Sequence, residues 1–207
     1  MLRLGNVAAP LDAGEKEIAE QVLHRLRIRR DELLSVKVKK KSVDARDKGD
    51  VHFVLTLDVC LKDENAVLRH LKPGIAARVQ PPAPMVLPKA AFEKPPVVVG
   101  AGPAGLFAAL TLARAGAQPI LIERGKPVEA RAQDVARMAE AGVLDTESNV
   151  QFGEGGAGAF SDGKLTTGIK SVHQQTVLET FVKHGAPEEI LYLAKPHIGT
   201  DLLRGVV

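Results

Sequence analysis

A glycine-rich turn between an apolar run and a helical pattern constrains this chain more than any other segment. The β-branched residues 97–99 precede Gly100-Ala101-Gly102-Pro103-Ala104-Gly105, and helix-forming residues follow at 106–113. A second apolar run at 120–122 then ends on Glu123, 23 residues after Gly100. This order predicts a strand, a tight turn, a helix and a parallel strand, which is the start of a Rossmann-like α/β domain.

Each part of this pattern has a physical role in holding a dinucleotide. Gly100 allows the tight turn, Gly102 lets a pyrophosphate approach the backbone, and Gly105 lets the helix pack close to the strand. The helix N-terminus, with Ala101, Pro103 and Ala104 around it, offers unpaired N–H groups to the phosphates. The Glu123 carboxylate accepts hydrogen bonds from ribose hydroxyls, which argues against NADP but does not separate FAD from NAD. The alternative is a βαβ unit with a glycine-rich turn and no ligand.

A second glycine-rich segment runs from Asn149 to Leu165, with the sequence NVQFGEGGAGAFSDGKL. Residues 153–158 also fit Gly-x-Gly-x-x-Gly, but Phe160-Ser161-Asp162-Gly163 follows, which is typical of a turn and not of a helix start. We therefore predict a loop whose backbone N–H groups meet a phosphate or a flavin, and not a second nucleotide-binding unit. A flexible surface loop is the alternative.

These segments, together with Glu123-Arg124-Gly125, resemble a family of bacterial FAD-dependent dehydrogenases of the two-dinucleotide-binding-domain flavoprotein type. The resemblance covers most of the chain, including residues 42–46 and 195–201. It implies an FAD held between the two glycine-rich segments, hydride transfer through the flavin, and NAD(P)H as an expected electron donor. The further cofactor-binding residues that it implies are Arg124, Arg131, Gly155, Gly156, Gly158 and Ser161, with Asp162 and Lys164 as weaker candidates. It names no substrate and no catalytic residue.

Proline content divides the chain. Six prolines between residues 81 and 96 exclude a helix or a central strand there. We predict a front module over 1–80, a Pro-rich linker over 81–95 and an FAD-binding dinucleotide domain over 96–207. Because the resembling family continues much further, we expect that domain to be incomplete and the chain to be the N-terminal part of a larger protein.

The front module is predicted to be α+β and ferredoxin-like. Residues 51–61 alternate between apolar and polar, as in a half-buried strand, and residues 36–39 suggest its partner. The segment 12–15 resembles a capping box with Asp12 as N-cap, and apolar residues at helical spacing follow it up to Leu26. A turn at 48–50 and a second short helix over 64–71 complete the pattern.

The front module is also locally basic. Residues 25–48 hold ten lysines and arginines against four acidic residues. No aromatic pair is interleaved with these charges for base stacking, so we expect no specific nucleic-acid binding and a solvated or docking face instead. The alternative function is a non-catalytic flavin- or nucleotide-binding module whose basic front domain binds a polyanion.

Several classes of chemistry find no support. Cys60 is the only cysteine, which excludes an internal disulfide and a redox dithiol. The six histidines lack metal-ligand spacing. His197 is expected to be a capping or hydrogen-bonded residue, with a catalytic role as the alternative. No apolar run approaches a membrane span and no signal peptide is apparent, so we expect a cytoplasmic protein that does not contact membranes.

Overall fold

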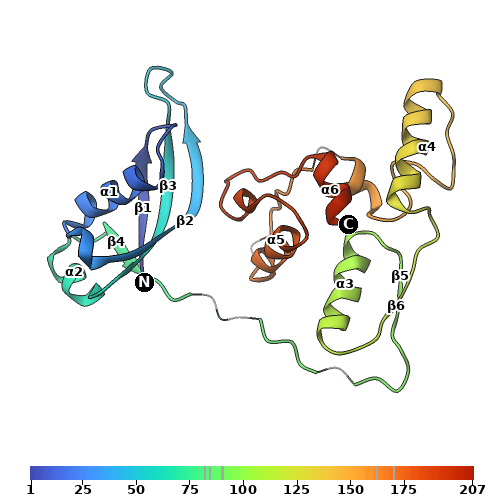
Figure 1. Cartoon of the computed structure of the whole chain (residues 1–207), viewed down its shortest axis with the longest axis horizontal. Helices are drawn as coiled ribbons and strands as arrows, with labels where there is room; N and C mark the ends of the chain where they lie inside the picture. Colours follow the sequence, from blue (N-terminus) through green and yellow to red (C-terminus); the bar gives the residue numbers. More distant parts are fainter. Residues whose placement is uncertain (82, 84, 90, 162, 170) are drawn as a thin grey trace. The chain divides into compact units, whose positions relative to one another are not determined.

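The computed structural model describes residues 1–81, 83, 85–89, 91–161, 163–169 and 171–207, apart from the side chain of Thr200. The chain forms two compact units. One comprises Met1–Ala83 together with Leu191–Pro196, and the other comprises Pro84–Ile190 together with His197–Val207. Figure 1 shows the elements of both.

The first unit is a four-stranded antiparallel sheet with helices packed on it. Its elements are β1 (Leu2–Ala9), α1 (Glu15–Leu26), the 3-10 helix η1 (Arg30–Glu32), β2 (Leu33–Asp44), β3 (His52–Leu61), α2 (Glu64–His70) and β4 (Ala76–Arg78). The strand order is β2-β3-β1-β4, and every neighbouring pair is antiparallel. α1 lies against the sheet (Figure 1). Its Val22 and Leu26 are fully buried, and they share the core with Leu57 and Val59 of β3 and with residues of β1.

Most of the local predictions for this unit are confirmed. The alternation over 51–61 forms β3, whose Leu55, Leu57, Val59 and Leu61 are buried, and β2 is its antiparallel partner. One prediction is wrong: the N-cap of α1 is Gly14 and not Asp12. The Gly14 N–H donates to the Glu17 carboxylate at 3.0 Å, so the glutamate satisfies the helix terminus from within the first turn.

The first unit also contains a short segment from much later in the chain. The Lys41 N–H of β2 donates to the Tyr192 carbonyl at 2.7 Å, and the Ala194 N–H donates to the Lys41 carbonyl at 2.9 Å. These bonds form a parallel bridge on the outer edge of β2. The chain therefore returns to the first unit for six residues before it re-enters the second at His197.

The second unit begins with the predicted strand, turn, helix and strand. β5 (Val97–Val99) pairs in parallel with β6 (Ile120–Ile122), and α3 (Pro103–Arg114) connects them. They are followed by α4 (Val128–Ala141), the 3-10 helix η2 (Gly156–Phe160), α5 (His173–Lys183), the 3-10 helix η3 (Glu188–Leu191) and α6 (Thr200–Val206). The described residues between 81 and 96 contain neither helix nor strand. None of the helices in the described part of the chain is long and apolar enough to cross a membrane.

Candidate functional site

The first glycine-rich turn has the strain and the close packing that its spacing predicts. Gly100 adopts a φ of +97°, a conformation that side chains disfavour, and its N–H donates to the Ile122 carbonyl at 2.7 Å. A Cβ atom built on Gly105 would lie 1.8 Å from the Gly100 carbonyl oxygen. Glycine at these two positions therefore sets the tight turn and the close contact between α3 and β5.

Gly102 has a different environment, because it faces open space. It is the N-cap of α3, with an ordinary extended backbone (φ −74°, ψ 179°), and Pro103 begins the helix. No heavy atom lies within 4 Å of a Cβ built there. The turn therefore leaves room for a group to touch the backbone at the N-terminus of a twelve-residue helix, where the helix dipole favours an anion.

Glu123 links this turn to the segment after β6. Its carboxylate accepts the Ala101 N–H at 2.6 Å and the Gly125 N–H at 2.7 Å. These two backbone hydrogen bonds stabilise the charged form and hold the pKa of Glu123 below its ordinary value. Because each carboxylate oxygen has a second lone pair, the half-buried side chain still has acceptor capacity for ribose hydroxyls.

The second glycine-rich loop packs directly on the first turn. The Gly155 N–H donates to the Ala101 carbonyl at 2.8 Å. A Cβ on Gly156 would lie 3.4 Å from Gly102 Cα, and one on Gly125 would lie 2.3 Å from Gly153 Cα. The two glycine-rich segments, about fifty residues apart, thus form one surface, and glycine is what permits their approach.

Arg131 of α4 holds this second loop in place. The side chain is fully buried, and its guanidinium donates to the carbonyls of Asn149, Val150, Glu154 and Gly156. It also lies 4.7 Å from the centre of the Phe160 ring. Burial lowers the pKa of the guanidinium, while the nearby charges of Glu123 and Glu154 oppose that shift. No described carboxylate forms an ion pair with it, so backbone dipoles and an aromatic face solvate the buried cation.

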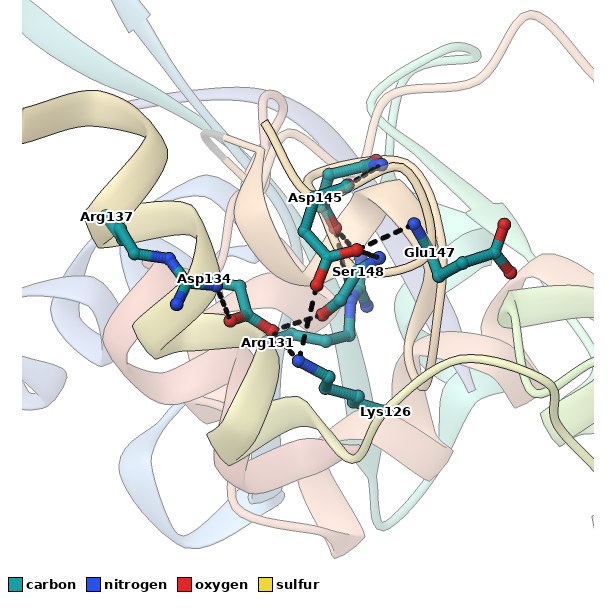
Figure 2. Close-up of polar contacts among 8 residues, drawn as sticks. Lys126, Arg131, Asp134, Arg137, Asp145, Glu147 and Ser148 are labelled. Atoms are coloured by element: carbon teal, nitrogen blue, oxygen red, sulfur yellow. Dashed lines mark hydrogen bonds and ion pairs between the residues drawn. The ribbon is translucent and has the colours of Figure 1, made fainter. Parts of the chain in front are cut away.

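A polar network connects α4 with the segments just before and after it (Figure 2). The Lys126 ammonium lies 2.7 Å from the Asp134 carboxylate and 3.5 Å from that of Asp145. Asp134 also accepts the Ser148 hydroxyl at 2.6 Å and pairs with Arg137 at 2.7 Å. Its pKa is held below its ordinary value, first by the hydrogen bond from Lys126 and then by that from Ser148.

The other predicted site residues lie at the margins of this arrangement. Arg124 is exposed, 3.4 Å from the Glu147 carboxylate and 5.9 Å from the centre of the Phe152 ring. The exposed Ser161 donates to the Gly158 carbonyl and accepts the Gly163 N–H. Lys164 and His197 form an antiparallel bridge, next to which the Ile198 N–H donates to the Gly163 carbonyl at 2.9 Å. Asp162 lies outside the described residues.

Sequence reasoning missed Glu154 and Asp134. The Glu154 carboxylate accepts the Val128 N–H at 2.9 Å, so the second loop caps the N-terminus of α4. Its position between Gly153 and Gly155 was the available signal. Among the described residues, no group of three His, Cys, Asp or Glu side chains is placed to hold a metal ion.

Comparisons with known proteins agree with this geometry. Residues 1–60 match a family described as a domain of unknown function, DUF8436, and residues 96–204 match the family described as an FAD binding domain. An uncharacterised protein from Clostridium beijerinckii is 42% identical over the whole of this chain, which spans 39% of that protein's length. The FAD binding domain match covers just over half of the 207 residues and includes both glycine-rich segments. This chain therefore belongs to the FAD binding domain family.

Proposed function

We propose that this chain binds FAD across its two glycine-rich segments and serves as a flavin-dependent oxidoreductase. The observation that carries the proposal is the open Gly102 at the α3 N-terminus, beside a second glycine loop. A cytoplasmic location, a small-molecule substrate and NAD(P)H as electron donor belong to the same proposal. The family match supports the cofactor.

Different residues of the chain would bind different parts of the cofactor. The backbone at Gly102 to Gly105 would bind the pyrophosphate, with the helix dipole of α3 offsetting its charge. Glu123 would hold the adenosine ribose through the free lone pairs of its carboxylate. Gly155, Gly156, Gly158 and Ser161 would line the far side of the cofactor, with Arg131 fixing their loop. When bound, the flavin ring supplies the capacity to accept and release a hydride.

We also propose that the front module is ferredoxin-like. The element order β-α-β-β-α-β supports this, as does the all-antiparallel strand order β4-β1-β3-β2. Fold alone assigns no activity to such a module.

Gly102→Val tests the cofactor site with little risk to the fold. The backbone at Gly102 is extended and its Cβ direction is open, so valine is accommodated in the free protein. The side chain would occupy the space that the pyrophosphate needs. We expect purified wild type to release FAD on denaturation, and Gly102→Val to carry none. Gly168→Val is the matched control, because Gly168 is equally open and its φ is not positive.

Two results would contradict the proposal. FAD retained by Gly102→Val at wild-type affinity would place the cofactor elsewhere, and release of NAD alone by the wild type would change its identity. Turnover is read separately: reduction of the bound flavin by NAD(P)H or substrate supports the oxidoreductase. A bound flavin that is never reduced favours the non-catalytic module with a basic, polyanion-binding front face.

A further inference from the structure

A six-residue segment, 191–196, belongs to the first unit although the chain on both sides of it belongs to the second. We call this segment the strap. The Lys41 N–H of β2 donates to the Tyr192 carbonyl at 2.7 Å, and the Lys41 carbonyl accepts the Ala194 N–H at 2.9 Å. Both bonds use the backbone of Lys41, whose ammonium lies 3.9 Å from the centre of the Phe53 ring. The strap therefore pairs with β2 without needing the lysine side chain.

The residues directly after the strap pair with another segment of the second unit. His197 forms an antiparallel bridge with Lys164, and the Ile198 N–H donates to the Gly163 carbonyl at 2.9 Å. Ile198 is fully buried. A Cβ built on Gly163 would overlap the Ile198 carbonyl oxygen, so glycine is needed for the two backbones to lie this close.

This second pairing reaches the glycine-rich loop that lies next to the first turn. The Gly163 N–H donates to the Ser161 hydroxyl at 3.2 Å, and that hydroxyl donates to the Gly158 carbonyl at 3.1 Å. Gly158 and Ser161 are among the residues that the proposed function gives to the cofactor. A continuous series of hydrogen bonds therefore runs from Ile198 to the second glycine-rich loop.

The order of these contacts along the chain has an energetic consequence. Pairing with β2 restricts the backbone of the strap up to the residue before His197. A segment that is already restricted at one end loses less conformational entropy when its neighbouring residues pair. The pairing of 197–198 with 163–164 should therefore be more favourable with the strap in place than after a free loop.

We infer that the strap is a positioning segment, through which the first unit stabilises the second glycine-rich loop and strengthens FAD binding. This gives a role to the unit whose residues 1–60 match a domain of unknown function. The effect on FAD rests on the proposed function. The effect on the loop rests on the hydrogen bonds alone, so the two effects can be measured separately.

Lys41→Pro tests the role of the strap, because proline lacks the N–H that donates to Tyr192. β2 is an edge strand, and this N–H points away from β3, so proline costs no bond within the sheet. We expect the FAD Kd of the 207-residue chain, measured by titration calorimetry, to rise about threefold to tenfold, as for the loss of one hydrogen bond. Ala194→Pro breaks the same bridge from the strap and should act alike. It also keeps the test valid if Lys41→Pro misfolds by circular dichroism.

The double variant distinguishes this role from general damage. Lys41→Pro combined with Ala194→Pro should bind FAD no more weakly than either single variant, because both break one bridge. Two unrelated perturbations would instead multiply their effects on the Kd.

Two controls isolate the backbone bonds. Lys41→Ala loses the contact with Phe53 but keeps both bonds to the strap, and it should bind FAD like wild type. Val43→Pro places proline two residues further along the same edge. Because N–H directions alternate along a strand, the Val43 N–H also points away from β3, but the bridge to the strap lies at Lys41. Val43→Pro should also bind FAD like wild type.

Hydrogen exchange in the chain without FAD reads the loop directly. The Ile198 and Gly163 amides should exchange faster in Lys41→Pro and Ala194→Pro, and at the wild-type rate in both controls. Unchanged exchange in the two variants would overturn the inference, as would a wild-type FAD Kd in both of them or an equal loss of affinity in Val43→Pro. A wild-type chain that binds no FAD would refute the proposed function, and the exchange rates would then decide whether the strap stabilises the loop.

Discussion

At the scale of single residues, Glu123 has a structural role besides the ribose contact that we propose for it. Its carboxylate joins the Ala101 N–H to the Gly125 N–H, so it stabilises the turn in the free protein. The lowered pKa means that this stabilisation is present above the ordinary carboxyl value of 4.5 and is lost as pH falls through the folded-state pKa. The residue is half-buried, which limits the effect through solvent screening.

Glu123→Gln tests whether the charge of Glu123 stabilises the turn. We expect the variant to be less stable than wild type by about 1 kcal/mol at pH 7, because hydrogen bonds to a charged acceptor are the stronger ones. The difference in unfolding free energy should narrow as pH falls below 4.5, the ordinary pKa of a glutamate. Wild type then loses the negative charge of Glu123, whereas glutamine is neutral throughout this pH range. Urea unfolding between pH 7 and pH 3 measures it, with the exposed Glu147→Gln as control. A gap that stays constant with pH would show that the charge of Glu123 is not involved.

Residue spacing predicted the tight turn at Gly100 and the close helix–strand contact at Gly105, because both depend only on residues near in sequence. It did not predict that Glu123 binds the Ala101 N–H. Chain spacing placed the acid at the end of β6, but a side-chain hydrogen bond depends on where the turn lies in space. The burial of Arg131 could not be predicted for the same reason. Its partners are backbone carbonyls, which every residue type carries, so the sequence does not identify them.

At the scale of elements, α4 and the second glycine loop act as one piece. Arg131 of α4 donates to the Glu154 carbonyl in the loop. In turn, the Glu154 carboxylate accepts the Val128 N–H and so caps α4. The first turn meets this piece through the Gly155 N–H. Loosening the loop should therefore weaken FAD binding even though Arg131 need not touch the cofactor.

Arg131→Met is the sharpest change to this piece. It removes the guanidinium donor from the buried Asn149 carbonyl and from three half-buried carbonyls, those of Val150, Glu154 and Gly156. We expect a loss of roughly 2–4 kcal/mol in the free energy of unfolding. Cleavage by limited proteolysis between residues 149 and 165 should become faster, and the FAD Kd should rise. Arg131→Lys should rescue only part of both effects, because an ammonium lacks the planar fork. Arg137→Met on the same helix is the control, since Arg137 is 54% exposed and pairs with the Asp134 carboxylate and not with the loop carbonyls that Arg131 binds. An unchanged rate of proteolysis in Arg131→Met would show that Arg131 does not hold the loop in place.

Elements with a strong periodic signal were predictable, and those made by distant pairing were not. β3 follows from its alternation, and α2 follows from a helical run over 64–71 that stops before Pro73. The structure adds that Asp63 caps α2. β4 has three residues, and the 191–196 segment joins β2 through two hydrogen bonds at Lys41. Neither carries a local pattern, because each is selected by a partner that lies far away in sequence.

At the scale of the whole molecule, the two units differ in how well their sheets are covered. The first unit buries its core residues almost completely. In the second, α3 packs on the Val98 side of β5, whereas the paired residues Val97–Ile120 and Val99–Ile122 are 49–82% exposed on the other face. Parallel sheets are normally covered on both faces, so this apolar face is available for contact with other molecules.

The last prediction concerns that uncovered face. We expect the 207-residue chain to self-associate as its concentration rises, because association removes apolar side chains from water. Val99→Lys places a charge at its most exposed position, on an edge where lysine opposes pairing, and should shift the chain toward the monomer without changing FAD binding. Size-exclusion chromatography with light scattering at several concentrations measures the shift. Val43→Lys, at a valine 59% exposed on β2 of the first unit, is the matched control and should leave association unchanged. A wild-type chain that is monomeric at every concentration, or a control that acts as strongly as Val99→Lys, would show that this face does not drive association.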